Sequence, residues 1–141
     1  MNPNIYKLLI VDDHPIVAEG IVSIASQQSN ILCKSITRME NLLPTISAES
    51  FDLCIIDLEL PEINGFLAYS HLLQEQMSDC KILIYTMHEE PWVIAKLAEE
   101  EISGAVSKNA STSELKQAIT QIRLGHKYFS EVFSIRSSFI I

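Results

Sequence analysis

The sequence has little of what would divide the chain or carry it into a membrane. Its 141 residues include only four glycines and five prolines, and no Pro-, Gly- or Ser-rich stretch separates one part from another. No apolar run approaches the ~20 residues that a membrane-spanning helix needs, and the N-terminus lacks the basic and apolar segments of a signal peptide. We therefore expect one domain of a cytoplasmic protein with no membrane contact.

Cysteine and basic residues are also scarce. Cys33, Cys54 and Cys80 are odd in number and lack CxxC spacing, so we expect buried, reduced thiols. Ten Lys and Arg stand against 18 Asp and Glu, which gives a net charge of −8. Because nucleic-acid binding depends on cations that neutralise phosphates, we expect this chain to reach DNA only through another domain.

Short apolar runs predict the strands of a buried parallel sheet. They show no polar alternation, which is typical of strands covered on both faces. The four main runs and a fifth candidate cover residues 8–11, 53–56, 82–85, 105–106 and 31–36.

Segments with helical spacing lie between these runs. One has Pro15 near its first turn, and the last has Ser111 and Glu114 as a capping box with Gly125 at its end. Weaker helical patterns cover 39–47, 65–76 and 91–100. Five strands alternating with five helices predict an α/β fold with a doubly wound parallel sheet, whose ligand site lies beyond the carboxyl ends of the strands.

Chemically active side chains collect at that edge of the predicted sheet. Asp12 and Asp13 follow the first strand, Asp57 the third, Thr86 the fourth and Lys108 the fifth. Three carboxylates brought close together either share protons or hold a cation, and a hard ion such as Mg²⁺ fits an oxygen set. The Lys108 ammonium group and the Thr86 hydroxyl beside them could bind an anion, because both donate hydrogen bonds. The pattern favours phosphoryl transfer with Asp57 as the nucleophile.

Four motifs, in this order, resemble the signatures of response-regulator receiver domains. They are VDDHP at 11–15, IDLELPEING at 56–65, YT at 85–86 and GAVSK at 104–108, and they span nearly the whole chain. The resemblance implies a flavodoxin-like receiver fold and a switch that a sensor histidine kinase phosphorylates on Asp57.

The same resemblance assigns roles to the other residues of the edge. Mg²⁺ would be held by Asp12, Asp13, the phosphorylated aspartate and the backbone carbonyl of Glu59. Thr86 would move toward the phosphoryl group, and Lys108 would pair with it. Such a switch phosphorylates itself from its donor and slowly loses the group again, so it is not a dedicated turnover enzyme.

The resemblance is closest to the branch of response regulators with a LuxR-type helix-turn-helix output domain. The receiver domain would occupy residues 1–126, with residues 127–141 as a tail or the start of a linker to an output domain that these residues do not contain. Phosphorylation would then change homodimerisation or DNA-binding output. A stand-alone receiver that acts through protein contacts is the alternative.

Two departures from the family pattern lie near Lys108. Ala105 stands where relatives commonly have a Tyr or Phe that relays the switch, so either another residue, such as Tyr85 or Trp92, would report the switch or the response would be weak. Lys108 is followed by Asn109 instead of proline. The resemblance suggests a cis bond here, which costs ~3–4 kcal/mol without proline.

The sequence is compatible with two other functions. Ala105 leaves open a degenerate receiver that works as an interaction module without phosphorylation. A phosphatase with an aspartyl nucleophile fits less well, because its nucleophile follows the first strand with a second Asp two residues on. His14 is predicted to be a helix-entry residue, and Glu89 and Glu90 to favour the dipole of the next helix.

Overall fold

The computed structural model describes residues 5–57, 80–98 and 102–133. The helix predicted at 65–76 and the predicted metal ligand Glu59 lie outside these described residues.

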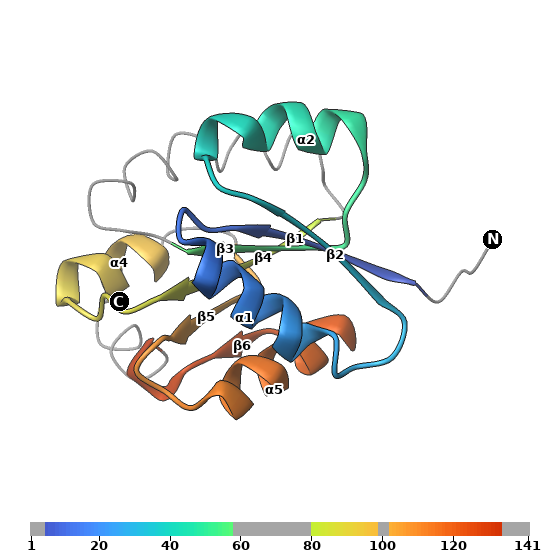
Figure 1. Ribbon diagram of the computed structural model, residues 1–141. Helices are drawn as coiled ribbons and strands as arrows, with labels where there is room; N and C mark the ends of the chain where they lie inside the picture. The colour runs from blue at the N-terminus through green and yellow to red at the C-terminus, as the bar shows by residue number, and fades with distance from the viewer. Residues whose placement is uncertain (1–4, 58–79, 99–101, 134–141) are drawn as a thin grey trace.

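The described strands form a single parallel sheet in the order β2-β1-β3-β4-β5-β6 (Figure 1). Strand β1 is second in this order. The chain continues from it to the edge strand β2 and then returns to add β3 on the other side of β1, so the strand order reverses beside β1. The predicted doubly wound α/β fold is confirmed, with a sixth strand that the sequence analysis missed. The strands are β1 (Tyr6–Val11), β2 (Ile31–Ile36), β3 (Leu53–Asp57), β4 (Lys81–Thr86), β5 (Gly104–Ser107) and β6 (Tyr128–Phe129).

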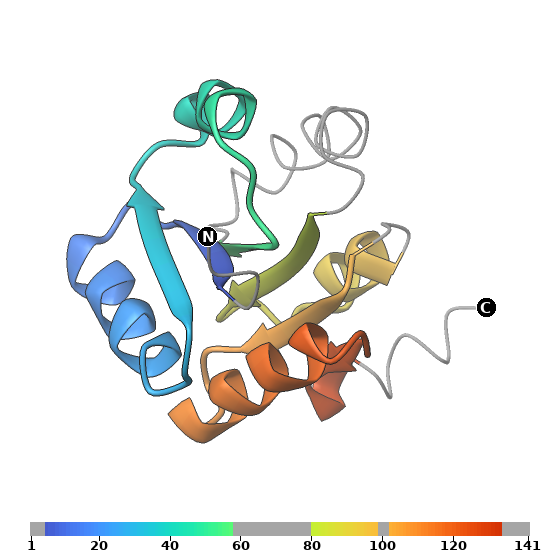
Figure 2. The same ribbon diagram turned by 90° about the vertical axis from the view of Figure 1, so that its right-hand side faces the viewer.

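Helices cover both faces of this sheet (Figure 2). Helices α1 and α5 pack on one face, and α2 and α4 pack on the other. Among the described residues the helical segments are α1 (Pro15–Ala25), the short 3-10 helix η1 (Met39–Asn41), α2 (Leu42–Ala48), α4 (Pro91–Ala98) and α5 (Thr112–Arg123), and residues 131–133 are also helical. No described helix is long and apolar enough to cross a membrane.

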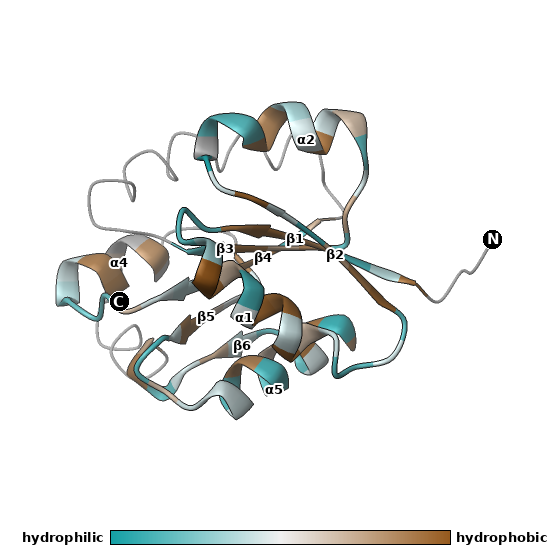
Figure 3. Ribbon diagram, viewed as in Figure 1, coloured by the Kyte–Doolittle hydropathy of each residue, from teal (hydrophilic) through white to brown (hydrophobic). Residues whose placement is uncertain are grey.

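Alternate residues of the central strands fill two separate halves of the core. In β1, Leu8 and Ile10 face α1 and α5, whereas Leu9 and Val11 face α2 and α4. All residues of β3, β5 and most of β4 are buried, and the middle of β3 and of β4 is accordingly apolar (Figure 3). Burial on both faces explains why these strands appear in the sequence as continuous apolar runs.

Two of the predicted helix ends are confirmed. Pro15 occupies the first turn of α1, with His14 as the residue that enters the helix. Gly125 follows α5 with a φ of 95°, and the backbone N–H groups of Gly125 and His126 donate to the carbonyls of Ile122 and Gln121. This is the hydrogen-bond pattern of a Schellman motif, which needs a left-handed residue that glycine adopts without strain.

The predicted capping box at the start of α5 is wrong. The side chain of Ser111 makes no cap hydrogen bond; its hydroxyl instead pairs with that of Ser113. The carboxylate of Glu114 accepts a hydrogen bond from the Ser130 hydroxyl, 16 residues away. Glu114 therefore forms a tertiary hydrogen bond and not the local capping interaction that the sequence pattern predicted for the start of α5.

Strand β6 and the turn after it pack on this same sheet. Phe129 aligns with Ala105 of β5, and Phe133 is only 3% exposed in the core half beneath α4. The close approach requires Gly104, because a Cβ atom there would lie 2.2 Å from the carbonyl oxygen of Tyr128. Residues 128–133 thus contact the domain core beyond the boundary predicted at residue 126.

Candidate functional site

The strand ends carry the candidate side chains to one edge of the sheet. Asp12 follows β1 directly, and Asp57, Thr86 and Ser107 are the last residues of β3, β4 and β5. Lys108 follows Ser107. Since all strands run parallel, their carboxyl ends meet at the same edge, beside the point where the strand order reverses.

Three carboxylates and one histidine form a tight cluster at this edge. Asp12, Asp13, His14 and Asp57 each offer an atom that lies within 4.8 Å of the others. Asp12 and Asp57 are buried, with exposed fractions of 1% and 5%. Among the described residues, Asp12 Oδ2 and Asp57 Oδ2 have no hydrogen-bond donor, and Asp57 Oδ1 faces only the Lys108 ammonium group. Buried acceptors of this kind are costly unless an ion or ligand satisfies them.

Local backbone geometry fixes the acidic pair. The His14 N–H donates to Asp12 Oδ1 at 2.8 Å, and the Asp12 N–H donates to the Ile36 carbonyl at 3.1 Å. The His14 ring places Nδ1 at 2.8 Å from Asp13 Oδ1. The turn into α1 therefore holds Asp12 inward and leaves Asp13 at the surface.

Lys108 provides the positive charge of the site. Its Nζ lies 2.7 Å from Asp57 Oδ1 and 3.7 Å from Asp12 Oδ2. Its backbone N–H donates to the Thr86 carbonyl at 2.8 Å, and its ammonium group lies 5.4 Å from the centre of the Tyr85 ring. The lysine thus reaches the buried carboxylates from the end of β5.

Burial dominates the electrostatics of Asp57. Loss of solvent raises the pKa of its carboxyl group to about 6, and the charge of Asp12 adds to that rise. The ammonium group of Lys108 opposes the rise but does not cancel it. The site therefore carries more negative charge than one lysine neutralises, and a further cation would stabilise the ionised form.

The cluster fits a hard divalent cation. Asp12, Asp13 and Asp57 supply carboxylate oxygens, the donors that Mg²⁺ prefers, and two of the three carboxylates have oxygens that no described donor satisfies. His14 belongs to the same cluster, but its Nδ1 contacts the Asp13 carboxylate. The three aspartates are therefore the residues that would hold such an ion.

Thr86 lies at the end of the strand next to β3. Its side chain is 1% exposed, and its hydroxyl oxygen accepts a hydrogen bond from the His88 N–H at 3.1 Å. This contact belongs to the turn that leads from β4 toward α4. The hydroxyl is thus placed on the strand that borders Asp57, at the start of a loop.

Ala105 is fully buried in the core half beneath α4. Its neighbour on the adjacent strand is Phe129, and Phe133 belongs to the same cluster. Of the two aromatic residues suggested as substitutes for a relay, Tyr85 lies on the opposite face of the sheet and contacts Lys108, whereas Trp92 is 46% exposed on α4. Rings contributed by the C-terminal segment therefore pack beside position 105.

Sequence reasoning missed a polar network around Lys108. The Glu89 carboxylate accepts hydrogen bonds from the Ser107 hydroxyl and from the Asn109 side-chain amide, the latter at 3.1 Å. A serine before the lysine and an asparagine after it were the available signals. The cis bond suggested at Lys108–Asn109 is wrong, since the described residues contain no cis peptide; without proline the trans form is strongly favoured.

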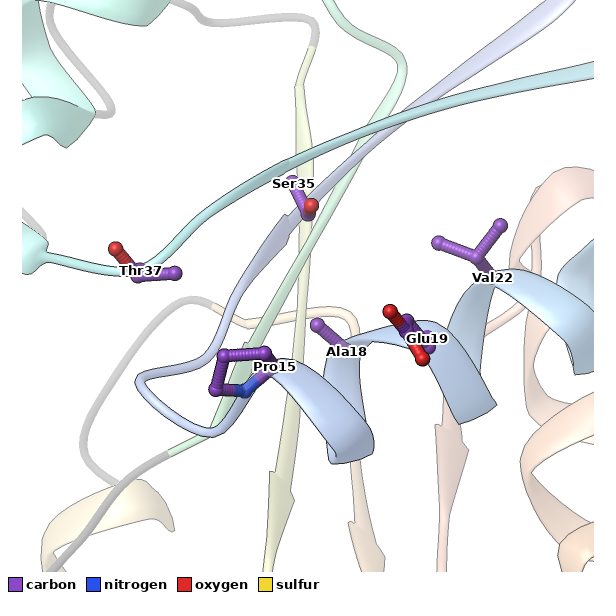
Figure 4. Close-up of a pocket in the computed structure, with 6 residues that line it drawn as sticks. All are labelled: Pro15, Ala18, Glu19, Val22, Ser35 and Thr37. Atoms are coloured by element: carbon purple, nitrogen blue, oxygen red, sulfur yellow. The ribbon is translucent and has the colours of Figure 1, made fainter.

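A separate shallow pocket of about 250 Å³ lies between α1 and the end of β2 (Figure 4). Glu19 is its only charged lining residue, so it offers neither a carboxylate cluster nor a cation for an anionic ligand. The lining residues are Pro15, Ala18, Glu19, Val22, Ser35 and Thr37.

Comparison with known proteins agrees with this geometry. Residues 8–120 match the family model of the response regulator receiver domain. The chain is 34% identical over 122 residues to the transcriptional regulatory protein ComA of Bacillus subtilis (strain 168), covering 84% of this chain and 56% of ComA. It therefore spans little more than half of that relative.

Solved structures show the same fold. The isolated REC domain of RcsB from Salmonella enterica serovar Typhimurium, in the presence of the phosphomimetic BeF3-, superposes with a TM-score of 0.83 at 22% identity over 94% of this chain and 99% of that chain. A structure of two RcsB dimers bound to two parallel DNAs gives a TM-score of 0.83 at 22% identity, over 96% of this chain and 69% of that chain.

Proposed function

Because this chain belongs to the response-regulator receiver family, we propose that it is a phosphorylation-dependent switch in which Asp57 accepts a phosphoryl group from the phosphohistidine of a sensor histidine kinase. One observation carries the proposal. The buried Asp57 carboxylate points one oxygen at the Lys108 ammonium group, 2.7 Å away, has no donor for its other oxygen among the described residues, and lies beside a second buried aspartate.

The reaction needs Asp57 as an ionised nucleophile. One of its carboxylate oxygens attacks phosphorus, the bond from phosphorus to the donor nitrogen breaks, and the imidazole leaves with the electron pair and takes up a proton. An acyl phosphate forms on Asp57. Lys108 lies at 2.7 Å from Asp57, so its ammonium group neutralises charge on the transferred oxygens and then pairs with the product.

The acidic cluster is proposed to hold Mg²⁺ through Asp12, Asp13 and Asp57, with the Glu59 carbonyl as a further ligand. A bound ion would offset the charge that gathers on the phosphoryl oxygens during transfer. Asp12 and Asp13 do not react; they would hold the ion from the turn before α1. Thr86 is proposed to donate its hydroxyl to a phosphoryl oxygen at the end of β4.

Receiver domains are signalling switches and not dedicated enzymes. A phosphoryl group that is slowly hydrolysed shifts the population between two states of the domain. For the whole protein we propose a transcriptional output, since the relative ComA is named a transcriptional regulatory protein. Contact with DNA would come from an output domain, and homodimerisation is one way in which phosphorylation would control it, as RcsB forms dimers on DNA.

Intact-mass measurement after incubation with acetyl phosphate and Mg²⁺ tests the proposal. We expect one added phosphoryl group, labile to hydroxylamine as acyl phosphates are, and no adduct in Asp57→Ala. Asp13→Ala should fold normally and take up the group more slowly at limiting Mg²⁺. Absence of an adduct under every metal condition would refute the proposal, and rapid turnover of diverse phosphomonoesters would favour a phosphatase.

A phosphorylation-independent interaction module is the second candidate, and Ala105 is the observation that favours it. With the usual aromatic position filled by a buried alanine, phosphorylation of Asp57 need not change the outer surface. Sedimentation and amide-exchange patterns would then be the same with and without the phosphoryl group. A change in either around α4 or β6 would exclude this candidate.

A further inference from the structure

Hydrogen bonds join the loop after β4 to the residues on both sides of Lys108. The Glu89 carboxylate oxygen Oε2 accepts the hydroxyl of Ser107 and the side-chain amide of Asn109. These are the residues immediately before and after Lys108. One carboxylate therefore spans the position from which the lysine side chain departs.

Backbone contacts complete this attachment. The Lys108 N–H donates to the Thr86 carbonyl at 2.8 Å, and the Asn109 N–H donates to the Ser107 hydroxyl oxygen at 3.1 Å. Ser107 is 4% exposed, and its own N–H donates to the Ser130 hydroxyl at 3.0 Å. The main chain at Lys108 is thus held by the loop after β4 and by the C-terminal segment.

The position of the main chain matters because a lysine carries its charge at the end of a flexible side chain. Its four-carbon stem has several rotatable bonds, so its ammonium group is placed accurately only where its backbone is fixed and its stem is packed. Asn109 contributes a side-chain amide donor that a proline at this position would lack. The hydrogen bond from Asn109 to Glu89 therefore offers a way to fix the lysine without a proline.

We propose that Glu89 is a positioning residue for phosphoryl transfer, which aims the Lys108 ammonium group at Asp57 by holding Ser107 and Asn109. This role rests on the function proposed above for Asp57, and it differs from the helix-dipole role predicted from sequence. Glu89 contacts no reacting atom in this mechanism. It acts through the two neighbours of the lysine.

Three variants separate positioning from a charge effect. Glu89→Ala removes the acceptor, Glu89→Gln keeps an oxygen that accepts both hydrogen bonds, and Glu90→Ala is the matched control. The Glu90 carboxylate lies 3.5 Å from His88 Nδ1 on the same loop. The measurements are the rate of phosphoryl uptake from acetyl phosphate at saturating Mg²⁺ and, separately, the Mg²⁺ affinity by titration calorimetry.

We expect Glu89→Ala to slow uptake about tenfold, in line with the cost of small misplacements in a reactive site. Its Mg²⁺ affinity should stay within about twofold, because the three aspartates are unchanged, and Glu89→Gln and Glu90→Ala should react at nearly the native rate. Equal acceleration in Glu89→Ala and Glu89→Gln would show a charge effect and overturn the proposal.

Two further measurements keep the test decisive. In a Lys108→Ala background, Glu89→Ala should have no additional effect on the uptake rate; an undiminished tenfold effect would show that Glu89 does not act through the lysine. NMR relaxation of the Lys108 ε-methylene group should show greater motion in Glu89→Ala than in Glu89→Gln. If Asp57 takes no phosphoryl group at all, the proposed function fails, and unchanged lysine motion would independently overturn the positioning role.

If Glu89→Ala does not fold, Ser107→Ala and Asn109→Ala each remove one of the two hydrogen bonds. We expect each to show a smaller loss of uptake rate than the tenfold predicted for Glu89→Ala, with increased Lys108 motion. Native rates and native lysine motion in both would refute the proposal.

Discussion

At the scale of single residues, burial sets the behaviour of Asp57 more strongly than its ion pair with Lys108. Its carboxyl group has a pKa raised to about 6, whereas a lysine at 2.7 Å alone would lower it. A folded state with a raised carboxyl pKa binds its proton more tightly than the unfolded state does. The ionised carboxylate therefore costs stability when no cation is bound.

The first prediction concerns Asp57→Asn in the metal-free domain. Urea unfolding with EDTA at pH 7.5 should show a free energy of unfolding about 1–3 kcal/mol above the native value, because one pKa unit corresponds to ~1.4 kcal/mol. The difference should be small below pH 4, should grow between the ordinary carboxyl pKa and the raised pKa of about 6, and should be constant above it, because both states are then ionised. A difference that does not vary with pH would contradict this account, and the exposed Asp13→Asn serves as the control.

The second prediction concerns the missing aromatic residue at position 105. Ala105→Phe should destabilise the domain by about 1–3 kcal/mol, since Ala105 is fully buried and the extra ring must displace packed neighbours. Phe129→Ala should relieve part of this cost in the double variant, because Phe129 lies beside position 105 on the next strand. Thermal unfolding measures both, and a single variant as stable as the native protein would refute the packing argument.

Residue-level prediction from sequence worked where a general rule places the side chain. The strand-end rule for parallel sheets predicted that Asp12, Asp57 and Lys108 would come together, and the structure brings the Lys108 ammonium group within 4 Å of both carboxylates. The contact of Glu89 with Ser107 could not be predicted in this way. It depends on the path of the loop after β4, for which the sequence carries no periodic signal.

At the scale of elements, the buried strands were the most predictable part. Burial on both faces favours apolar side chains on successive residues, except at the carboxyl ends that form the site, so four of the strands stand out as runs. Strand β6 was not predicted because it has only two residues, Tyr128 and Phe129. It can lie beside β5 only because Gly104 has no side chain. The wrong capping box has a similar origin, since Ser130 of the C-terminal segment binds Glu114.

The third prediction tests the C-terminal segment as a structural element. A chain ending at residue 127 should lose about 3–5 kcal/mol of unfolding free energy relative to a chain ending at 133, because Phe133 is buried and its removal opens a cavity. The matched single variant Phe133→Ala should account for much of the loss. Equal stability of the two chains would instead support a domain that ends near residue 126.

The fourth prediction uses Gly104 to test the pairing of β6 with β5. Gly104→Ala should destabilise the chain that ends at 133, because its Cβ would lie 2.2 Å from the Tyr128 carbonyl oxygen. In the chain that ends at 127 that clash is absent and only the Leu83 side chain, at 3.1 Å, has to yield. The cost of the substitution in urea unfolding should therefore be smaller in the shorter chain; equal costs would argue against the pairing.

At the scale of the whole molecule, the order of apolar and helical segments bears on the fold, whereas the net charge bears on the partners. The alternation of apolar runs and helical segments predicted the doubly wound sheet. Crossovers between parallel strands are right-handed, so only a few strand orders are possible for such a sequence. Net charge says nothing about that fold, but it does bear on partners. A protein with a charge of −8 repels the phosphate backbone of DNA.

The fifth prediction follows from this charge. Fluorescence anisotropy with duplex DNA should show no saturable binding by the 141-residue chain up to ~100 μM at 150 mM salt, a range that covers ordinary non-specific binding. Phosphorylation replaces the single charge of the Asp57 carboxylate with the roughly −2 charge of an acyl phosphate, so it makes the domain more negative and should not create binding. Salt-sensitive binding tighter than ~10 μM would contradict the prediction. Its absence in both states would mean that any effect on transcription passes from Asp57 through protein contacts before it reaches DNA.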